Sequence, residues 1–221
     1  KLSLIFPVRS ESFTSMDYFY TPPSLIRNAS LTIEGEELHH LSKVLRKKVG
    51  ETIYVVDGNE HAYKVIIKSI SRSAAECEIQ DTLYRWNEPN VEVKLAVALL
   101  KNPSRFDFIV EKCTELGVRE IIPMRTERTI VSKVHVDRLQ KIALSAMKQC
   151  GRSFLPPIHP PLIFPEVLTY LERCDQKFIT HEKADQMIAG GVGKGIGESV
   201  NTLGILIGPE GGFTEEEVQS A

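Results

Sequence analysis

Residues 203–218 read LGILIGPEGGFTEEEV, and this stretch carries the strongest signal for the fold. An apolar run of strand length ends in a loop with three glycines and a proline, and an acidic segment follows at once. Thr214 followed by Glu217 fits a capping box, and glutamates in a first turn suit the positive end of a helix dipole. Since glycine permits close backbone approach, the loop is either a tight strand-to-helix turn or a place where backbone amides face a ligand.

Length and composition are those of an ordinary globular protein. The 221 residues are 42% hydrophobic and 25% charged, and they suffice for one large domain or two small ones. The four cysteines are widely scattered and form no Cys-x-x-Cys pair, which argues against a zinc knuckle or a redox motif. Reduced thiols in a cytoplasmic protein are the simplest account, and no apolar run approaches membrane-spanning length.

The net charge of −2 conceals an uneven distribution. Residues 101–152 carry 11 Lys and Arg against 6 Asp and Glu, a balance of +5. Residues 153–221 carry 4 against 10, a balance of −6. The basic block permits a phosphate-binding face, although such blocks are also common on solvated helix surfaces.

Residues 16–86 predict a small β-rich domain with one helix, preceded by an N-terminal extension at residues 1–15. Strands are expected at 52–56, 62–70 and 76–83, the first two joined by an Asp-Gly turn. The helix is expected at 36–48, because its apolar residues form one stripe; they are Leu38, Leu41, Val44 and Leu45. The other face is basic, with His39, His40, Lys43, Arg46, Lys47 and Lys48.

Residues 91–221 predict an α/β domain, separated from the first by the polar linker at 86–90. Strands and helices alternate, which favours a mainly parallel sheet. Expected strands are 91–100, 118–124, 177–180 and 203–207, and expected helices are 105–116, 136–150 and 166–173. Because ligands in such sheets bind beyond the carboxyl ends of strands, residues 208–213 lie where a ligand is expected.

Two conspicuous motifs predict no site. Residues 191–197, GVGKGIG, fit neither the dinucleotide fingerprint nor the P-loop spacing, so a surface loop is expected there and a dehydrogenase is disfavoured. The adjacent pair His39 and His40 points in different directions on a helix, which makes it a poor metal site. No metal is therefore predicted.

Cations and amides follow several predicted elements of the second domain. Each alone is more often solvated, but together they predict a loop-built site, since Arg binds phosphate through two hydrogen bonds and Lys as a point charge. The residues are Lys101, Arg105, Arg125, Glu127, Arg128, Gln149, Gly151 and Arg152.

These stretches resemble one known family. Residues 39–50, HHLSKVLRKKVG, resemble the signature HHL-x-x-VLR-x-x-x-G of the RsmE-type 16S ribosomal RNA uridine-N3 methyltransferases. The matches continue in order through Lys101, ELGV at 115–118 and Glu127-Arg128. QCGR at 149–152 resembles the family's QSGR, and IGPEGGF at 207–213 matches its most distinctive loop.

The resemblance implies a PUA-like RNA-binding barrel at 16–86 and a SPOUT domain at 91–221, whose C-terminal segment forms a trefoil knot. It implies S-adenosylmethionine as cofactor, a homodimer, and 16S ribosomal RNA or the small ribosomal subunit as partner, with no membrane. The family continues with a second cofactor loop, LG-x-RILR-x-ETA, which has no counterpart here. The C-terminal end of the SPOUT domain is therefore expected to be missing from this chain.

The resemblance also assigns residues to roles. Arg128 and Arg152 are expected to steer phosphate or the base, because a nearby cation stabilises a developing uracil anion. Glu210 is a candidate proton acceptor, or else a cap for backbone amides. The expected cofactor residues are Thr180, His181, Glu182, Ile207, Gly208, Pro209, Gly211 and Gly212. The expected RNA contacts are His40, Lys43, Arg46, Lys47 and Lys101.

Two alternatives stay open from the sequence. One is a non-catalytic RNA-binding protein, which would bind no S-adenosylmethionine. The other is a SPOUT methyltransferase that acts on a different RNA, such as transfer RNA.

Overall fold

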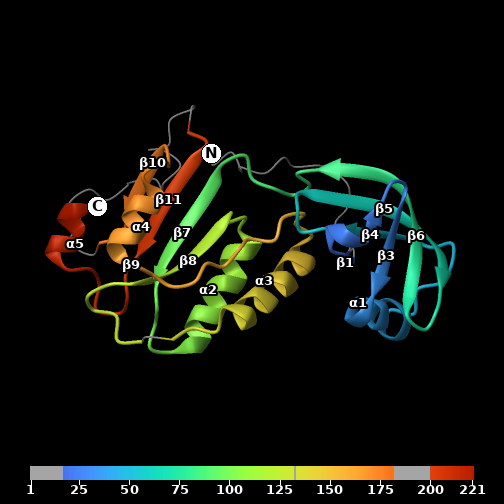
Figure 1. Cartoon of the computed structure of the whole chain (residues 1–221), viewed down its shortest axis with the longest axis horizontal. Helices are drawn as coiled ribbons and strands as arrows, with labels where there is room; N and C mark the ends of the chain where they lie inside the picture. The colour runs from blue at the N-terminus through green and yellow to red at the C-terminus, as the bar shows by residue number, and fades with distance from the viewer. Residues whose placement is uncertain (1–16, 132, 182–199) are drawn as a thin grey trace, which may run out of the picture. The chain divides into compact units, whose positions relative to one another are not determined.

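The computed structural model describes residues 17–131, 133–181 and 200–221, and the chain divides into two compact units (Figure 1). The first unit contains Lys1–Glu88 and Leu144–Leu155, and the second contains Pro89–Ala143 and Pro156–Ala221. The break after Glu88 falls in the predicted linker, whereas residues 144–155 group with the first unit. The physical reason is packing: Met147 lies in one core cluster with Val56 and Ala62, and Lys148 bonds to Glu37.

The first unit is built on a six-stranded sheet with the order β1-β4-β5-β6-β3-β2. Strand β1 runs parallel to β4, and all other pairs are antiparallel. Side chains that alternate in burial along β5 and β6 give the sheet a core face, whose fully buried residues include Phe19, Ile33, Val55 and Ile67. The strands are β1 Tyr18–Tyr20, β2 Ile26–Arg27, β3 Ser30–Glu34, β4 Thr52–Val56, β5 His61–Ile70 and β6 Ala74–Tyr84.

The three strands predicted in this unit are confirmed, but the helix predicted at 36–48 is too long. Helix α1 covers Gly35–His39, a π-helical turn follows at His40–Val44, and Arg46 adopts a left-handed backbone with φ of 53°. Leu38 and Leu41 are buried as expected, whereas Val44 is 60% exposed and does not belong to the apolar stripe. The backbone leaves the α-helical path before the stripe is complete.

The second unit is built on a five-stranded sheet with the order β10-β11-β7-β8-β9, whose pairs are all parallel, where the sequence predicts a mainly parallel sheet. Figure 1 shows helices α2 and α3 on one side of this sheet and α4 on the other. The strands are β7 Glu92–Ala98, β8 Glu120–Arg125, β9 Leu162–Ile163, β10 Gln176–Ile179 and β11 Thr202–Ile207. The helices are α2 Pro103–Glu115, α3 Val136–Cys150, α4 Phe164–Leu171 and α5 Glu215–Ser220.

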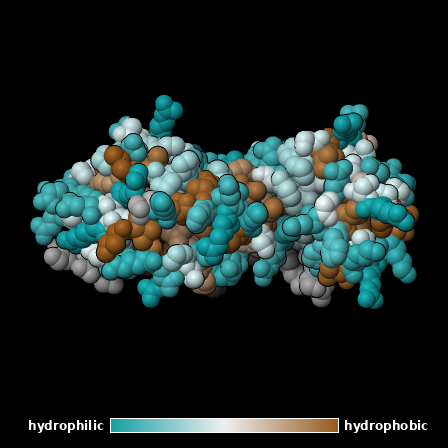
Figure 2. Space-filling view, turned by 60° about the horizontal axis from the view of Figure 1, so that its bottom comes forward, coloured by the Kyte–Doolittle hydropathy of each residue, from teal (hydrophilic) through white to brown (hydrophobic). Residues whose placement is uncertain are grey.

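The expected N-terminal extension at 1–15 and the expected surface loop at 191–197 lie outside the described residues. Within the described ranges, no helix has the length and apolar character to cross a bilayer. On the face seen in Figure 2, hydrophobic side chains lie in patches among hydrophilic ones.

Candidate functional site

The loop at residues 208–213, which follows β11, lies at the carboxyl edge of the parallel sheet. Ile207 pairs with Val97 of β7, and Leu206 pairs with Ile179 of β10, so the three strands end side by side. The Gly212 amide donates to the Pro209 carbonyl at 2.8 Å, and Gly212 has φ of +67°, a conformation that favours glycine. This 208–213 loop is therefore a tight turn at the ligand-binding edge of the sheet.

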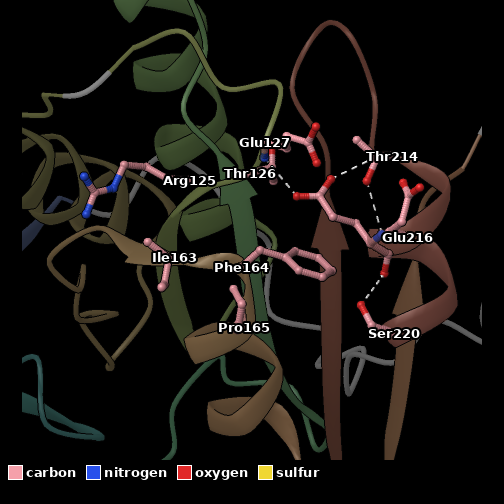
Figure 3. Close-up of a pocket in the computed structure, with 10 residues that line it drawn as sticks. Arg125, Thr126, Glu127, Ile163, Phe164, Pro165, Thr214, Glu216 and Ser220 are labelled. Carbon is pink, nitrogen blue, oxygen red and sulfur yellow. Dashed lines mark hydrogen bonds between the residues drawn. The ribbon is translucent and has the colours of Figure 1, made fainter.

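A complete capping box fixes the end of the loop, as the sequence predicts. The Thr214 hydroxyl accepts a hydrogen bond from the Glu217 amide at 3.2 Å, and the Glu217 carboxylate accepts one from the Thr214 amide at 3.0 Å. The second carboxylate oxygen of Glu217 accepts the Glu127 amide at 2.9 Å. Figure 3 shows Thr214 and Glu127 facing each other across this contact. The start of α5 is thus bound to the segment after β8.

Two further side chains tie the loop to its neighbours. Arg128 follows β8, and its Nη1 donates to the carbonyls of Gly211 at 2.7 Å and Phe213 at 3.3 Å. Glu210 belongs to the loop itself, and its carboxylate accepts the amide of Lys101, which follows β7, at 3.1 Å. The loop is therefore held from the β7 side and the β8 side.

The loop leaves backbone donors available. Among the residues that the structure describes, the amides of Gly208, Gly211 and Phe213 donate to no acceptor. Buried or half-buried backbone donors normally have partners, and Phe213 is only 2% exposed because its ring packs against Phe164. Unsatisfied amides at the carboxyl edge of a sheet fit a ligand with acceptor atoms, such as the adenine and ribose of a nucleoside cofactor.

The acidity of Glu210 argues for the amide-capping role. A hydrogen bond from its own amide, the amide of Lys101 and the charges of Lys101 and Arg105 lower the pKa of Glu210 below its ordinary value, against the opposing effect of burial. A general base works best when its pKa lies near the operating pH. The pKa of Glu210 is lowered, away from neutral pH. The carboxylate is therefore better suited to anchor the loop through the Lys101 amide than to act as a base.

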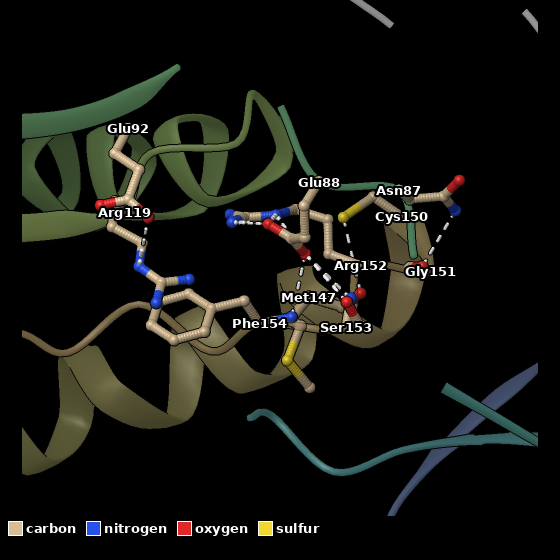
Figure 4. Close-up of polar contacts among 10 residues, drawn as sticks. All are labelled: Asn87, Glu88, Glu92, Arg119, Met147, Cys150, Gly151, Arg152, Ser153 and Phe154. Carbon is tan, nitrogen blue, oxygen red and sulfur yellow. Dashed lines mark hydrogen bonds and ion pairs between the residues drawn. The ribbon is translucent and has the colours of Figure 1, made fainter. Parts of the chain in front are cut away.

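Arg152 has a different environment, which Figure 4 shows. Its side chain lies in the first unit with Glu88, and each side chain of the pair is 3% exposed. Nε and Nη2 of Arg152 donate to the Glu88 carboxylate at 3.1 and 2.6 Å, and the amides of Ser153 and Phe154 donate to the same carboxylate at 3.0 and 2.9 Å. The expected role of Arg152 in steering phosphate stays a prediction, but the contacts favour a structural role.

The predicted wall on the β10 side is partly described. The amide and hydroxyl of Thr180 both donate to the Leu206 carbonyl, at 3.0 and 3.2 Å, which fixes the end of β10 against β11. His181 follows it and is half-buried, and Glu182 lies outside the described residues. Thr180 and His181 therefore lie on the same edge as the 208–213 loop.

A hollow of about 450 Å³ adjoins this edge, and its lining includes Arg125 and Glu127, which belong to the loop-built site predicted from the sequence. It lies between the ends of β8 and β9, the start of α4 and the first turn of α5 (Figure 3). Arg125, Thr126, Ile163, Pro165 and Glu216 are among the residues that line it. In the part of the chain described here, no His, Cys, Asp and Glu cluster is arranged to hold a metal ion.

The predicted RNA contacts fall in both units. His40, Lys43, Arg46 and Lys47 lie in or just after the π-helical turn of the first unit, and Lys101 belongs to the second. The His40 ring packs against the edge of Phe19 with ring centroids 5.9 Å apart, and Lys47 lies 3.9 Å from Glu51. Lys43, Arg46 and Lys101 are exposed.

Comparison with known proteins shows which class of protein this chain belongs to. A family model described as an RNA methyltransferase domain matches residues 87–221, and one described as an RNA methyltransferase PUA domain matches residues 33–80. The Ribosomal RNA small subunit methyltransferase E of Synechocystis sp. is 31% identical over 234 residues, which cover 99% of this chain and 73% of the relative. The enzyme of the same name from Bacillus subtilis is 28% identical over 204 residues, which cover 86% of this chain and 77% of the relative.

Solved structures agree. The Ribosomal RNA small subunit methyltransferase E from Neisseria gonorrhoeae, bound to S-adenosyl methionine, is 30% identical with a TM-score of 0.80, over 94% of this chain and 85% of that chain. A probable rRNA-methyltransferase from Porphyromonas gingivalis is 26% identical with a TM-score of 0.78, over 93% of this chain and 84% of that chain. The protein is an RNA methyltransferase with a PUA-like unit and a SPOUT-type α/β unit, as predicted. The chain belongs to the ribosomal RNA small subunit methyltransferase E family.

Proposed function

We propose that this protein transfers a methyl group from S-adenosylmethionine to N3 of a uridine in 16S ribosomal RNA of the small subunit. Family membership and the cofactor bound to the Neisseria gonorrhoeae enzyme support the proposal. The observation that carries it is the 208–213 loop, which presents unsatisfied amides at the carboxyl edge of the sheet and is held there from both sides.

The chemistry explains why such a loop is needed. S-adenosylmethionine supplies an electrophilic methyl group on a sulfonium. Uracil N3 carries a proton at neutral pH, so the N3–H bond breaks as the N3–carbon bond forms, the proton passes to an acceptor, and S-adenosylhomocysteine leaves. Alignment of the two reactants lowers the barrier greatly, and the residues of this chain provide it by fixing the position of the cofactor.

The proposal assigns cofactor contacts to the two neighbouring strand ends. The residues are Thr180, His181, Glu182, Ile207, Gly208, Pro209, Gly211 and Gly212. Arg128 holds the loop through the carbonyls of Gly211 and Phe213, and a direct action on the base or a phosphate is the alternative that the kinetics of an Arg128 variant decide. Glu210 anchors the loop, and Arg152 maintains the fold of the corner that it occupies.

The proposal extends to the setting of the reaction. The protein acts as a homodimer in the cytoplasm, its SPOUT unit forms a trefoil knot, and its substrate is the small subunit or its RNA. The names of the relatives support the small subunit as substrate.

The test is methyl transfer to defined RNA. Purified protein and S-adenosylmethionine with a tritiated methyl group are incubated with small subunits from a strain that lacks the protein, and the modified uridine is mapped. We expect one labelled uridine, methylated at N3. If calorimetry shows no cofactor binding while RNA binds, the protein is a non-catalytic RNA-binding protein. If only transfer RNA is labelled, the chemistry stands and the target is different.

A further inference from the structure

The turn after β8 and the segment that leads into α5 hold each other through reciprocal contacts. Glu217 of α5 accepts the backbone amide of Glu127 at 2.9 Å. In return, the side chain of Arg128 donates to the backbone carbonyls of Gly211 and Phe213, at 2.7 and 3.3 Å. Each segment therefore contributes one charged side chain and receives one, so neither can shift without breaking charge-assisted hydrogen bonds.

The turn that carries Arg128 is itself closed by hydrogen bonds. The Thr129 amide donates to the Thr126 carbonyl at 3.1 Å, and the Thr126 amide donates to the Thr129 hydroxyl at 2.9 Å. These bonds make a β-turn whose second residue is Glu127 and whose third is Arg128. Because the two residues are neighbours in a closed turn, the bond from the Glu127 amide to Glu217 also fixes the point from which the Arg128 side chain extends.

Two peptide groups near the end of the loop are bonded on both sides. The group between residues 211 and 212 bonds through its carbonyl to Arg128 and through its amide to the carbonyl of Pro209. The group between residues 213 and 214 bonds through its carbonyl to Arg128 and through its amide to Glu217. Since a peptide group is planar, a bond on each side fixes its orientation.

The neighbouring peptide groups carry free donors. The amides of Gly211 and Phe213 donate to no acceptor within the described residues. Each of these amides is separated from a fixed peptide group by the two soft backbone dihedrals of a single residue. The direction in which both amides point therefore depends on Arg128 and, through the turn after β8, on Glu217.

We propose that Glu217 is a positioning residue for methyl transfer, because it holds Arg128 and the two free amides in the arrangement that receives the cofactor. Glu217 does not touch the cofactor and acts through the Glu127 amide. The inference rests on the proposed function, since it takes the 208–213 loop as the S-adenosylmethionine site. It gives a second role to a glutamate that also forms half of the capping box.

The first test compares Glu217→Gln with Glu216→Gln. Glu216 is the matched control, because it is an exposed neighbour whose side chain makes no hydrogen bond within the described residues. Glutamine keeps one acceptor oxygen and loses the charge, so it serves at most one of the two amides well. We expect affinity for S-adenosylmethionine, measured by calorimetry, to fall about tenfold in Glu217→Gln and to stay unchanged in the control.

Steady-state kinetics separate positioning from a loss of fold. In Glu217→Gln, the KM for the cofactor should rise by the same factor as the dissociation constant, while kcat and the KM for RNA change little. A merely structural defect lowers the fraction of active protein, which reduces the apparent kcat without raising the KM for the cofactor. In the cofactor-free protein, the Gly212 amide should exchange with solvent faster in Glu217→Gln than in Glu216→Gln.

A second variant breaks the same contact from the other side. Glu127→Pro removes the amide that Glu217 accepts, and proline is common at the second position of a β-turn. The capping box of α5 stays intact, so we expect the same fall in cofactor affinity with little loss of helix stability. Thr214→Ala makes the opposite change and should weaken affinity less. Glu127→Pro decides the question if Glu217→Gln does not fold.

The double variant Arg128→Ala with Glu217→Gln shows whether Glu217 acts through Arg128. If it does, affinity falls about as far as in Arg128→Ala alone, because residues that act through one shared contact have non-additive effects. Losses that multiply as independent effects would overturn the inference.

The remaining outcomes separate this inference from the proposed function. If the wild type binds S-adenosylmethionine and transfers methyl groups while Glu217→Gln and Glu127→Pro bind the cofactor equally tightly, the inference fails and the proposed function stands. If kcat falls in both variants at an unchanged KM for the cofactor, Glu217 supports only the fold and has no positioning role. If the wild type itself binds no cofactor, the proposed function fails and the inference fails with it.

Discussion

Arg128 and Arg152 each follow an element of the second predicted domain, and both are expected from the sequence to steer phosphate or base. The structure separates them. Arg128 is exposed and donates to the carbonyls of Gly211 and Phe213. Arg152 is 2% exposed and donates to the carboxylate of Glu88. Within the described residues, Arg128 bonds only to backbone carbonyls of the loop, whereas Arg152 is paired with a buried carboxylate.

The difference shows what burial requires of a guanidinium. A buried guanidinium needs an opposite charge beside it, and the remaining acceptor sites of that carboxylate must receive hydrogen bonds from other donors. Glu88 does both, because it binds Arg152 and also the amides of Ser153 and Phe154. Gly151 beside it has φ of +69°, and a Cβ there would approach the Tyr18 ring to 2.5 Å. The corner at 150–154 is thus specified by packing and pairing, whereas amides of the 208–213 loop have no acceptor among the described residues.

The largest expected effect comes from breaking the buried pair. Arg152→Ala leaves the Glu88 carboxylate buried without its counter-charge, which costs about 3–5 kcal/mol of unfolding free energy. Urea denaturation measures it. The matched control is Arg128→Ala, a change of the same side chain at an exposed site, for which a smaller loss of about 1–2 kcal/mol is expected from its two hydrogen bonds. Equal losses in the two variants would remove the structural distinction between the arginines.

The second effect is on cofactor binding. Arg128→Ala removes two charge-assisted hydrogen bonds that hold the loop, and we expect affinity for S-adenosylmethionine to fall about 10- to 100-fold. The KM for the cofactor should rise while kcat changes little, and Arg128→Lys should restore part of the affinity. Calorimetry and steady-state kinetics measure the two quantities. A fall in kcat with unchanged cofactor affinity would instead make Arg128 a catalytic residue.

The sequence predicted those elements whose position depends on residues close together in the chain. Helix α3 has the predicted bounds, Val136–Cys150, because its apolar residues recur at helical spacing, and the capping box at Thr214 depends on two residues three positions apart. The short strands β1, β2 and β9 were not predicted, since two or three residues of strand give little periodic signal, and the five-residue strand β3 was missed as well. The π-helical turn at His40–Val44 was missed because an apolar stripe does not reveal a change of backbone path.

The site could be located from the sequence, but the roles of its residues could not. The glycines after a buried strand and the parallel sheet placed the 208–213 loop correctly. The partners of the two arginines were invisible, since Arg128 bonds to a carbonyl 83 residues away and Arg152 to a carboxylate 64 residues away. Nothing in the spacing of a single sequence says which cation finds a buried carboxylate.

A smaller effect tests the cap that ends the loop. Thr214→Ala removes the hydroxyl that accepts the Glu217 amide, and loss of such a cap costs about 1 kcal/mol. We expect this loss of unfolding free energy together with a modest weakening of cofactor affinity, because the loop ends at this residue. Thr214→Ser keeps the hydroxyl and serves as the control. If the loss of stability appears without any change in affinity, the cap supports α5 alone.

The smallest effect concerns pH and the carboxylate of Glu210, the exposed counterpart of Glu88. Hydrogen bonds from its own amide and from Lys101 lower the pKa of Glu210 in the folded state. A carboxyl group whose pKa is lower in the folded state stabilises the fold at pH values above its unfolded-state pKa. This stability is lost as the pH falls through its folded-state pKa. Affinity for S-adenosylmethionine should therefore stay level from about pH 8 to pH 5 and decline in acid.

Other carboxylates titrate in acid as well, among them Glu120 and Asp175, whose pKa values are also lowered. The informative quantity is therefore the difference between the wild type and Glu210→Gln, with Glu216→Gln as a control at an exposed glutamate nearby. The acid decline should be smaller in Glu210→Gln than in either reference, since the amide of Gln still offers an acceptor but cannot be protonated in this range. The methyl-transfer rate of the wild type could instead depend on pH near neutrality while that of Glu210→Gln does not. That result would identify Glu210 as the proton acceptor. The 208–213 loop would then take part in proton transfer through Glu210, whereas the carboxylate of the buried corner, Glu88, only pairs with Arg152.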